Sequence, residues 1–184
     1  MESSDLCPET EIGNLLDLLG SDEAAGRDQV RHLLTTYPSD ARLHFLHGSL
    51  LAASKAYGEA HDYFAQAVAL APDYKVARYQ MGLLELSSGD PVSAAATWAP
   101  LEALDADDAL RLFATGLQHL ARDEFAEATE CLTAGLANNH ENPAINRDIQ
   151  LILASMETTE PPEDGATSAA HLLLQQYSMK DTKH

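Results

Sequence analysis

The residues of this 184-residue chain whose types and spacing come closest to a metal site are His44 and His47. Two side chains three positions apart lie on one face of a helix, and imidazole is a common zinc ligand, so the pair could hold a metal together with a third ligand. Their helix is expected to turn this face toward a partner helix, which favours partly buried packing. We therefore expect no metal site.

Other groups that could do chemistry have simpler explanations. The carboxylates of Asp105, Asp107 and Asp108 lack the glycine and the distal glutamate of a calcium loop, and they indicate a turn that caps a helix. Cys7 and Cys131 form no metal-binding or redox spacing, so both are interpreted as reduced thiols. The chain has no phosphate-binding loop, nucleophile elbow or metalloprotease motif. We expect no catalytic residues, no cofactor and no enzymatic activity.

The charge of the chain limits the class of its partners. It carries 29 acidic against 11 basic side chains, a formal net charge of -18 at pH 7. A field of this sign repels phosphate backbones and anionic lipid, so we expect neither nucleic acid nor a membrane as a partner. The longest uncharged stretch, 91–101, is about half of the roughly 20 residues that a membrane-spanning helix needs. The first residues show no secretory or lipoprotein signal, so we expect a cytoplasmic protein.

Three columns of residues recur every 34 positions and indicate a repeat. Glycine forms the first column, alanine follows twelve positions later, and a large apolar residue stands four positions after the alanine. The members are Gly48, Gly82 and Gly116; Ala60, Ala94 and Ala128; and Phe64, Trp98 and Leu132. Small residues let two helices cross closely, and a large side chain on the same face fills the space alongside. The pattern therefore predicts pairs of closely packed helices.

These columns resemble the tetratricopeptide repeat, a 34-residue helix–turn–helix unit. Three units match it: 41–74, 75–108 and 109–142. The first unit carries the signature residues Gly48, Tyr57, Ala60, Phe64, Ala67 and Pro72. The second has Ala106 where the closing proline is expected. The resemblance implies an all-α fold, an α-solenoid of helical hairpins.

The remaining segments are expected to cap and extend this stack. Residues 1–40 are interpreted as a degenerate N-terminal repeat that keeps a small residue at Gly26. A capping helix is predicted over 143–156, because its apolar residues share one face. Acids and prolines predict a flexible linker over 157–166, and helical spacing returns in an amphipathic C-terminal tail, 167–184.

Local signals agree with helical hairpins. Helix N-caps are expected at Asp40, Asp73, Asp90 and Asn142. Proline follows two of these caps at the first helical position, where its missing N–H is tolerated. Gly89 is expected to end a helix before a turn. No segment has the features of a strand.

The resemblance places the first helix of each repeat along a concave groove and thereby names its lining. The predicted peptide-binding residues are Arg42, Phe45, Leu46, Ser49, Val76, Tyr79, Gln80, Leu83, Leu86, Leu110, Phe113, Leu117 and Leu120. This lining is apolar and aromatic, with Arg42 as its cation. It lacks the lysines, arginines and asparagines with which some members of the family hold carboxylate tails. A core role for the same side chains is the alternative interpretation.

An apolar groove of this kind is expected to bind an apolar or amphipathic segment of another protein. We therefore predict a non-catalytic adaptor or scaffold whose protein partner offers an apolar or basic segment. Two alternatives remain: a small acidic chaperone that resembles, at fold level, those of type III secretion, and a regulatory subunit of an enzyme complex. In the tail, Leu173, Leu174 and Tyr177 could bind the groove of the same or a neighbouring protomer. A homo-oligomer is therefore a further alternative.

Overall fold

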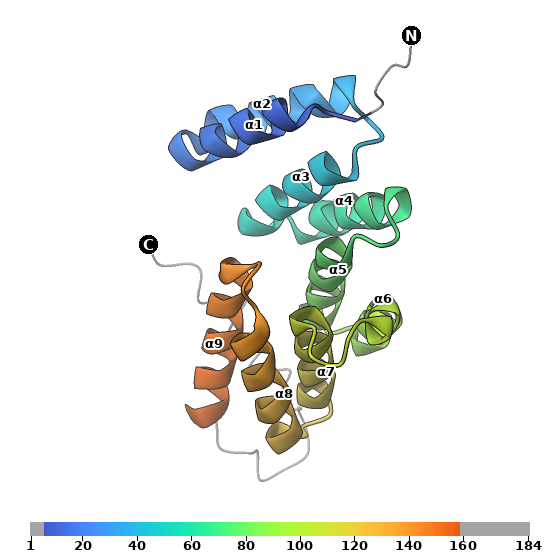
Figure 1. Ribbon diagram of the computed structural model, residues 1–184, viewed down its shortest axis with the longest axis vertical. Helices are drawn as coiled ribbons and strands as arrows, with labels where there is room; N and C mark the ends of the chain where they lie inside the picture. Colours follow the sequence, from blue (N-terminus) through green and yellow to red (C-terminus); the bar gives the residue numbers. More distant parts are fainter. Residues whose placement is uncertain (1–5, 159–184) are drawn as a thin grey trace. The chain divides into compact units, whose positions relative to one another are not determined.

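The computed structural model describes residues 6–158, and within this range the chain folds into α-helices, one short 3₁₀ helix and connecting turns, with no strand (Figure 1). The elements are α1 (Glu9–Ser21), α2 (Glu23–Thr36), α3 (Ala41–Ala53), α4 (Tyr57–Leu70), α5 (Lys75–Ser87), α6 (Pro91–Trp98), η1 (Ala99–Ala103), α7 (Ala109–Ala121), α8 (Phe125–Asn138) and α9 (Pro143–Thr158). Helices adjacent in the chain pack in pairs. The all-α fold class predicted from the sequence is confirmed.

Helices begin at intervals of 34 residues along the chain. The first residues of α3, α5, α7 and α9 are 41, 75, 109 and 143, and those of α2, α4, α6 and α8 are 23, 57, 91 and 125. Of these α-helices, only α1 departs from this spacing. It begins at Glu9, directly after Pro8. The period seen in the sequence is therefore also a period of the backbone, and it reaches into the N-terminal hairpin.

The chain divides into two compact units, Met1–Met81 and Gly82–His184, with the boundary inside α5. In the first unit α1 packs on α2, α2 on α3, and α3 on α4. One hydrophobic core cluster of this unit consists of Cys7, Ile12, Leu15, Val30, Leu33 and Leu43. In the second unit α7 packs on α6 and α8, and α9 packs on α8 with the isoleucine face that its sequence predicts. A solenoid-like succession of helix pairs runs through each unit.

Each glycine of the repeat lies against the second helix of its own hairpin. The pairs are Gly48 with Phe64, Gly82 with Trp98 and Gly116 with Leu132. A Cβ atom placed on Gly48 would come within 2.9 Å of the Phe64 ring, and one on Gly116 within 2.8 Å of Leu132. These distances are too short for a real Cβ atom. The close helix crossing predicted from the glycine column is confirmed.

The turn inside each hairpin of the repeat also follows the period. Lys55, Gly89 and Asp123 adopt positive φ angles of 65°, 86° and 58°. The residue after each of them donates its N–H to a carbonyl five positions back, for example from Ala56 to Leu51 at 2.9 Å. This bond and the left-handed residue define a Schellman motif, which satisfies carbonyls at the helix end. Gly89 ends its helix as predicted, and two non-glycine residues take the same strained conformation.

Side-chain caps start several of the helices. Asp40 accepts a hydrogen bond from the Arg42 N–H at 2.9 Å, and Asp90 accepts one from the Ser93 N–H at 2.9 Å. Asp108 caps α7, as the interpretation of its acidic cluster as a capped turn requires. The expected cap at Asp73 is wrong, because α5 begins at Lys75 and the residue before it is a tyrosine.

One helix is shorter than its counterparts in the other hairpins, and another runs past its predicted end. The α6 helix stops at Trp98, after 8 residues, whereas α4 and α8 each have 14. Pro100 follows in η1, and its ring has no N–H to donate to the preceding turn, so the α-helix cannot continue regularly. The α9 helix runs to Thr158, two residues into the predicted linker. The rest of that linker and the predicted tail lie outside the described residues.

Candidate functional site

Seven of the predicted groove residues are buried in the structure. They are Tyr79, Leu83, Leu86, Leu110, Phe113, Leu117 and Leu120. Tyr79 and Phe113, two aromatic members of the predicted lining, have no exposed surface. These seven side chains therefore lie where the alternative interpretation placed them, in the interior, and they offer no open lining.

The packing of Phe113 explains why this residue is buried, although its position in the repeat predicted a surface. A Cβ atom added to Gly135 of α8 would lie 2.5 Å from the Phe113 ring. The ring thus occupies the space that this glycine leaves, between α7 and α8 of one hairpin. Its neighbour Leu112 also lies near this glycine, at 3.3 Å from the same added atom. Phe113 is a core residue of the second unit.

The other six predicted residues are half-buried, and all of them precede the boundary of the first unit. They are Arg42, Phe45, Leu46, Ser49, Val76 and Gln80. The Phe45 ring lies 5.9 Å from the ring of Phe64 and 5.3 Å from that of Tyr74, centre to centre, which is a normal aromatic packing distance. Leu46 packs against the core that α1, α2 and α3 share. What stays partly open is a strip of α3 and the start of α5.

Arg42, the predicted cation of the groove, is held by the N-terminal segment. Its guanidinium donates to both carboxylate oxygens of Asp40 and to the Cys7 carbonyl at 2.6 Å, and it pairs with Glu9. The Cys7 N–H completes the network with a bond of 2.9 Å to Asp40. Arg42 therefore fastens the start of α1 to the start of α3, and its charge is already matched.

This network sets the protonation of its members. Burial alone would raise the pKa of Asp40, but hydrogen bonds from the Arg42 side chain, the Cys7 N–H and the Arg42 N–H together hold it below the usual value. The same bond to Asp40 raises the pKa of Arg42. Burial raises the pKa of the Cys7 thiol, with nearby carboxylates adding to the effect. Cys7 is thus a protonated, buried thiol, as expected for a reduced cysteine.

The two histidines pack on the second helix of their hairpin, as the sequence interpretation expected. The His47 ring meets Tyr63 of α4 edge-on at 4.4 Å, and the His44 ring lies 5.8 Å from the same tyrosine. His44 also bonds through Nε2 to the Pro38 carbonyl at 2.8 Å. Among residues 6–158, no group of three histidine, cysteine or carboxylate side chains is placed to hold a metal.

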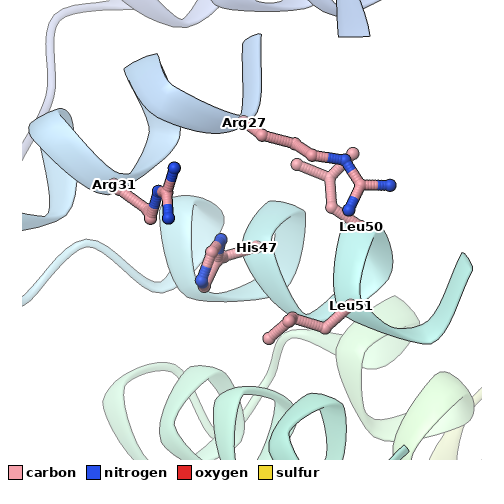
Figure 2. Close-up of a pocket in the computed structure, with 5 residues that line it drawn as sticks. All are labelled: Arg27, Arg31, His47, Leu50 and Leu51. Atoms are coloured by element: carbon pink, nitrogen blue, oxygen red, sulfur yellow. The ribbon is translucent and has the colours of Figure 1, made fainter. Parts of the chain in front are cut away.

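A pocket of about 130 Å³ opens between α2 and α3 of the first unit. Figure 2 shows Arg27 and Arg31 on α2 and the other three lining residues, His47, Leu50 and Leu51, on α3. Sequence reasoning considered His47 only as one of a histidine pair, and it missed this site because the other lining residues belong to no motif. One signal was present: two arginines four positions apart on one helix of a strongly acidic chain.

The polar groups of this pocket differ in how well they are paired. Arg27 bonds to Glu23 on its own helix and reaches Ser54 beyond α3 at 3.2 Å, and Arg31 pairs with Asp28. The Nδ1 atom of His47 is buried and has no hydrogen-bond partner. An unpaired buried polar atom of this kind costs about 1–3 kcal/mol.

The His47 ring is held in its neutral form. Burial lowers its pKa, and the charge of Arg31 lowers it further, while Glu59 acts in the opposite direction. Neutral imidazole has one N–H donor and one acceptor nitrogen. The pocket therefore combines two cations, a neutral imidazole and an apolar wall.

No protein-family model matches the chain, and no curated protein matches it. In the part of the chain that the structure describes, no helix is both long enough and apolar enough to cross a membrane. Leu173, Leu174 and Tyr177, the predicted ligand of the groove, lie outside the described residues.

Proposed function

We propose that this chain is a tetratricopeptide-type repeat protein that acts as a non-catalytic adaptor, binding an apolar or amphipathic segment of a partner protein. The observation that carries the proposal is the recurrence of one hairpin every 34 residues, in helix starts, glycine contacts and left-handed turns alike. Stacked hairpin repeats create extended binding surfaces, which favours a protein that binds a partner.

The strip of half-buried residues on α3 and the start of α5 supports this role. Phe45 and Val76 are apolar side chains that folding leaves partly exposed, with Ser49 and Gln80 beside them. A partner helix that covers such residues gains the rest of their apolar burial, and the polar neighbours fix its register. The contact surface we propose is therefore this strip, not the full lining predicted from the sequence.

The charge of the protein favours a partner with basic residues around its apolar anchors. A net charge of -18 raises the local concentration of cationic segments and accelerates their association. The rate of association is expected to fall as ionic strength rises, because exposed charges beyond about 8 Å are screened at 0.15 M salt.

Site-specific photo-crosslinking tests the proposal in cells that express the protein. A benzoylphenylalanine at Gln80 places the reactive group in the strip, and the same residue at Glu130, exposed on α8, is the matched control. We expect one partner to be captured from Gln80 and also from Val76, and not from Glu130. The same capture from all three positions would show non-specific contact and would contradict the proposal.

The stability of the captured partner separates the adaptor from the alternatives. A chaperone client should aggregate when this protein is depleted, whereas a partner joined by an adaptor should stay soluble. A regulated enzyme should stay soluble and change its activity. We expect a soluble partner whose assembly with other proteins is lost.

A further inference from the structure

We propose that the pocket between α2 and α3 binds an aliphatic carboxylate, a monoanion with a short hydrocarbon stem, through Arg27, Arg31 and His47. The site lies on the α2 side of α3 and is independent of the adaptor strip. It is a cationic pocket in a chain whose net charge is -18. Three features of the pocket support this proposal: its charged side chains, an unpaired buried atom and the shape of the cavity.

The pairing of the arginines favours one negative charge in the ligand. Glu23 and Asp28 already neutralise Arg27 and Arg31, but these pairs are exposed and lie within one helix, where ion pairs are weak. A guanidinium has five N–H donors, so each arginine keeps donors for another acceptor. A monoanion can compete with these weak pairs for the remaining donors, and its desolvation costs less than that of a dianion.

His47 supplies a donor that nothing in the described structure satisfies. Its Nδ1 atom is buried without a hydrogen-bond partner, and its ring meets Tyr63 edge-on at 4.4 Å. The ring lines the pocket, and in the tautomer that protonates Nδ1 this N–H donates to a carboxylate oxygen there once the ring turns toward the cavity. The arginines can hold the second oxygen, since carboxylates accept up to four hydrogen bonds.

The walls of the pocket define the stem of the ligand. Leu50 and Leu51 make one side apolar, and Leu50 also packs against the core of the unit, which keeps this wall in place. The volume of about 130 Å³ is close to that of a cavity of about 150 Å³ that holds benzene in another protein. A carboxylate with a few methylene groups fits this size.

Binding is expected to strengthen as the pH falls toward the pKa of His47. The groups that act on this ring are Arg27 and Arg31 from α2, His44 from its own helix, and Glu59 and Tyr63 from α4. A bound carboxylate adds a negative charge beside the ring, which raises its pKa. By linkage, the protonated form then binds the carboxylate more tightly than the neutral form.

The test is a titration of the full chain, with ¹⁵N-labelled histidine, by sodium butyrate at constant ionic strength. The His47 resonances, assigned by their loss in His47→Gln, report on the pocket. We expect a saturable shift in the millimolar range, which suits a ligand of about six heavy atoms, and a raised pKa of His47 in the complex. Butyramide has the same shape without the charge and should cause no saturable shift. No saturation with butyrate, or equal shifts with both, would overturn the proposal.

A pair of variants separates the pocket from the overall charge. Arg31→Gln removes a side chain that bonds only within α2 in the described structure, so folding should be unaffected, and we expect about tenfold weaker butyrate binding. Arg147→Gln on α9 changes the net charge equally and should leave the affinity unchanged. Equal weakening in both variants would show a charge effect alone.

Two further ligands identify the source of the carboxylate. N-acetylglutamate amide carries the group as it appears in a peptide side chain. If it binds at least as tightly as butyrate, the site accepts an acidic side chain of a protein; if only butyrate binds, the ligand is a free acid. Both results support a carboxylate site. Tighter binding of inorganic phosphate than of butyrate at the same pH would overturn it.

Discussion

Gly82 of α5 lies so close to the indole ring of Trp98 of α6 that no Cβ atom fits between them. Trp98 is fully buried, and its rigid ring cannot turn aside as a flexible side chain would. The same contact, between glycine and a large side chain, recurs at Gly48 and Gly116. The glycine column thus sets the distance between the two helices of a hairpin.

Replacing this glycine should destabilise the protein although alanine is the better helix former. We expect Gly82→Ala to lower the free energy of unfolding by about 1–2 kcal/mol, because the strain of overpacking, toward the upper end of about 1–3 kcal/mol, exceeds the gain in helix propensity of about 1 kcal/mol. Urea unfolding followed by far-ultraviolet circular dichroism measures the change.

Gly13 of α1 is the matched control for this substitution. It lies inside a helix, and a Cβ atom there would meet nothing within 4 Å. We expect Gly13→Ala to raise the free energy of unfolding by about 0.5–1 kcal/mol. A gain in both variants would show that α5 and α6 can separate freely, which would contradict the role given to the glycine column.

In the left-handed turns, replacing a residue by glycine should stabilise the protein. Lys55 and Asp123 take positive φ angles that cost about 1–2 kcal/mol for a residue with a Cβ atom. Lys55→Gly should therefore stabilise the protein by about 0.5–1 kcal/mol after the entropy of glycine is subtracted, and Gly89→Ala should destabilise it by the same amount. Thermal unfolding measures both. Lys55→Ala keeps the strain, so a gain there as large as that of glycine would disprove the explanation.

Much of the fold could be predicted because it depends on local and periodic signals. Glycine and proline mark where helices cross or end, and a 34-residue period turns each such mark into a prediction for the next hairpin. The left-handed conformation at Asp123 could have been predicted in this way, since it stands 34 residues after Gly89. The early end of α6 was missed because Pro100 departs from the period.

The candidate site was harder to predict because exposure depends on all neighbours of a side chain. The position of Phe113 in the repeat predicted that it lines an open groove. Its ring instead lies inside the hairpin, because Gly135 has no side chain there. The pocket beside His47 joins side chains of two different hairpins, Arg27 and Arg31 from one and His47 from the next. Neither feature follows from one repeat read by itself.

The network around Asp40 predicts how stability depends on pH. Burial would raise the pKa of Asp40, but hydrogen bonds from Arg42 and from Cys7 lower it below its value in the unfolded chain, about 3.9. The stability that this carboxylate contributes is therefore fully present above that pH and is lost as the pH falls through the lower, folded pKa. Asp40→Asn should lower the free energy of unfolding by about 2 kcal/mol at pH 7, and the difference should shrink below about pH 4.

Asp40→Ala separates the charge from the helix cap. Asparagine can still cap α3, whereas alanine cannot, so the alanine variant should be about 1 kcal/mol less stable than the asparagine variant at every pH. Urea unfolding at a series of pH values gives both quantities. A difference between wild type and Asp40→Asn that is independent of pH would show that the Arg42 pair contributes nothing through its charge.

Phe45 and Phe113 occupy equivalent positions in their repeats, and the structure gives them different roles. Phe113 is fully buried against Gly135, so Phe113→Ala should lower the free energy of unfolding by about 3–5 kcal/mol. Phe45 is half-buried, so Phe45→Ala should cost about half as much and leave the helical circular dichroism unchanged. If the strip on α3 binds the partner, Phe45→Ala should also abolish the photo-crosslink from Gln80. A folded Phe45→Ala variant that crosslinks as well as wild type would remove Phe45 from the contact surface, because a partner helix seated on this strip cannot avoid the largest apolar side chain in it.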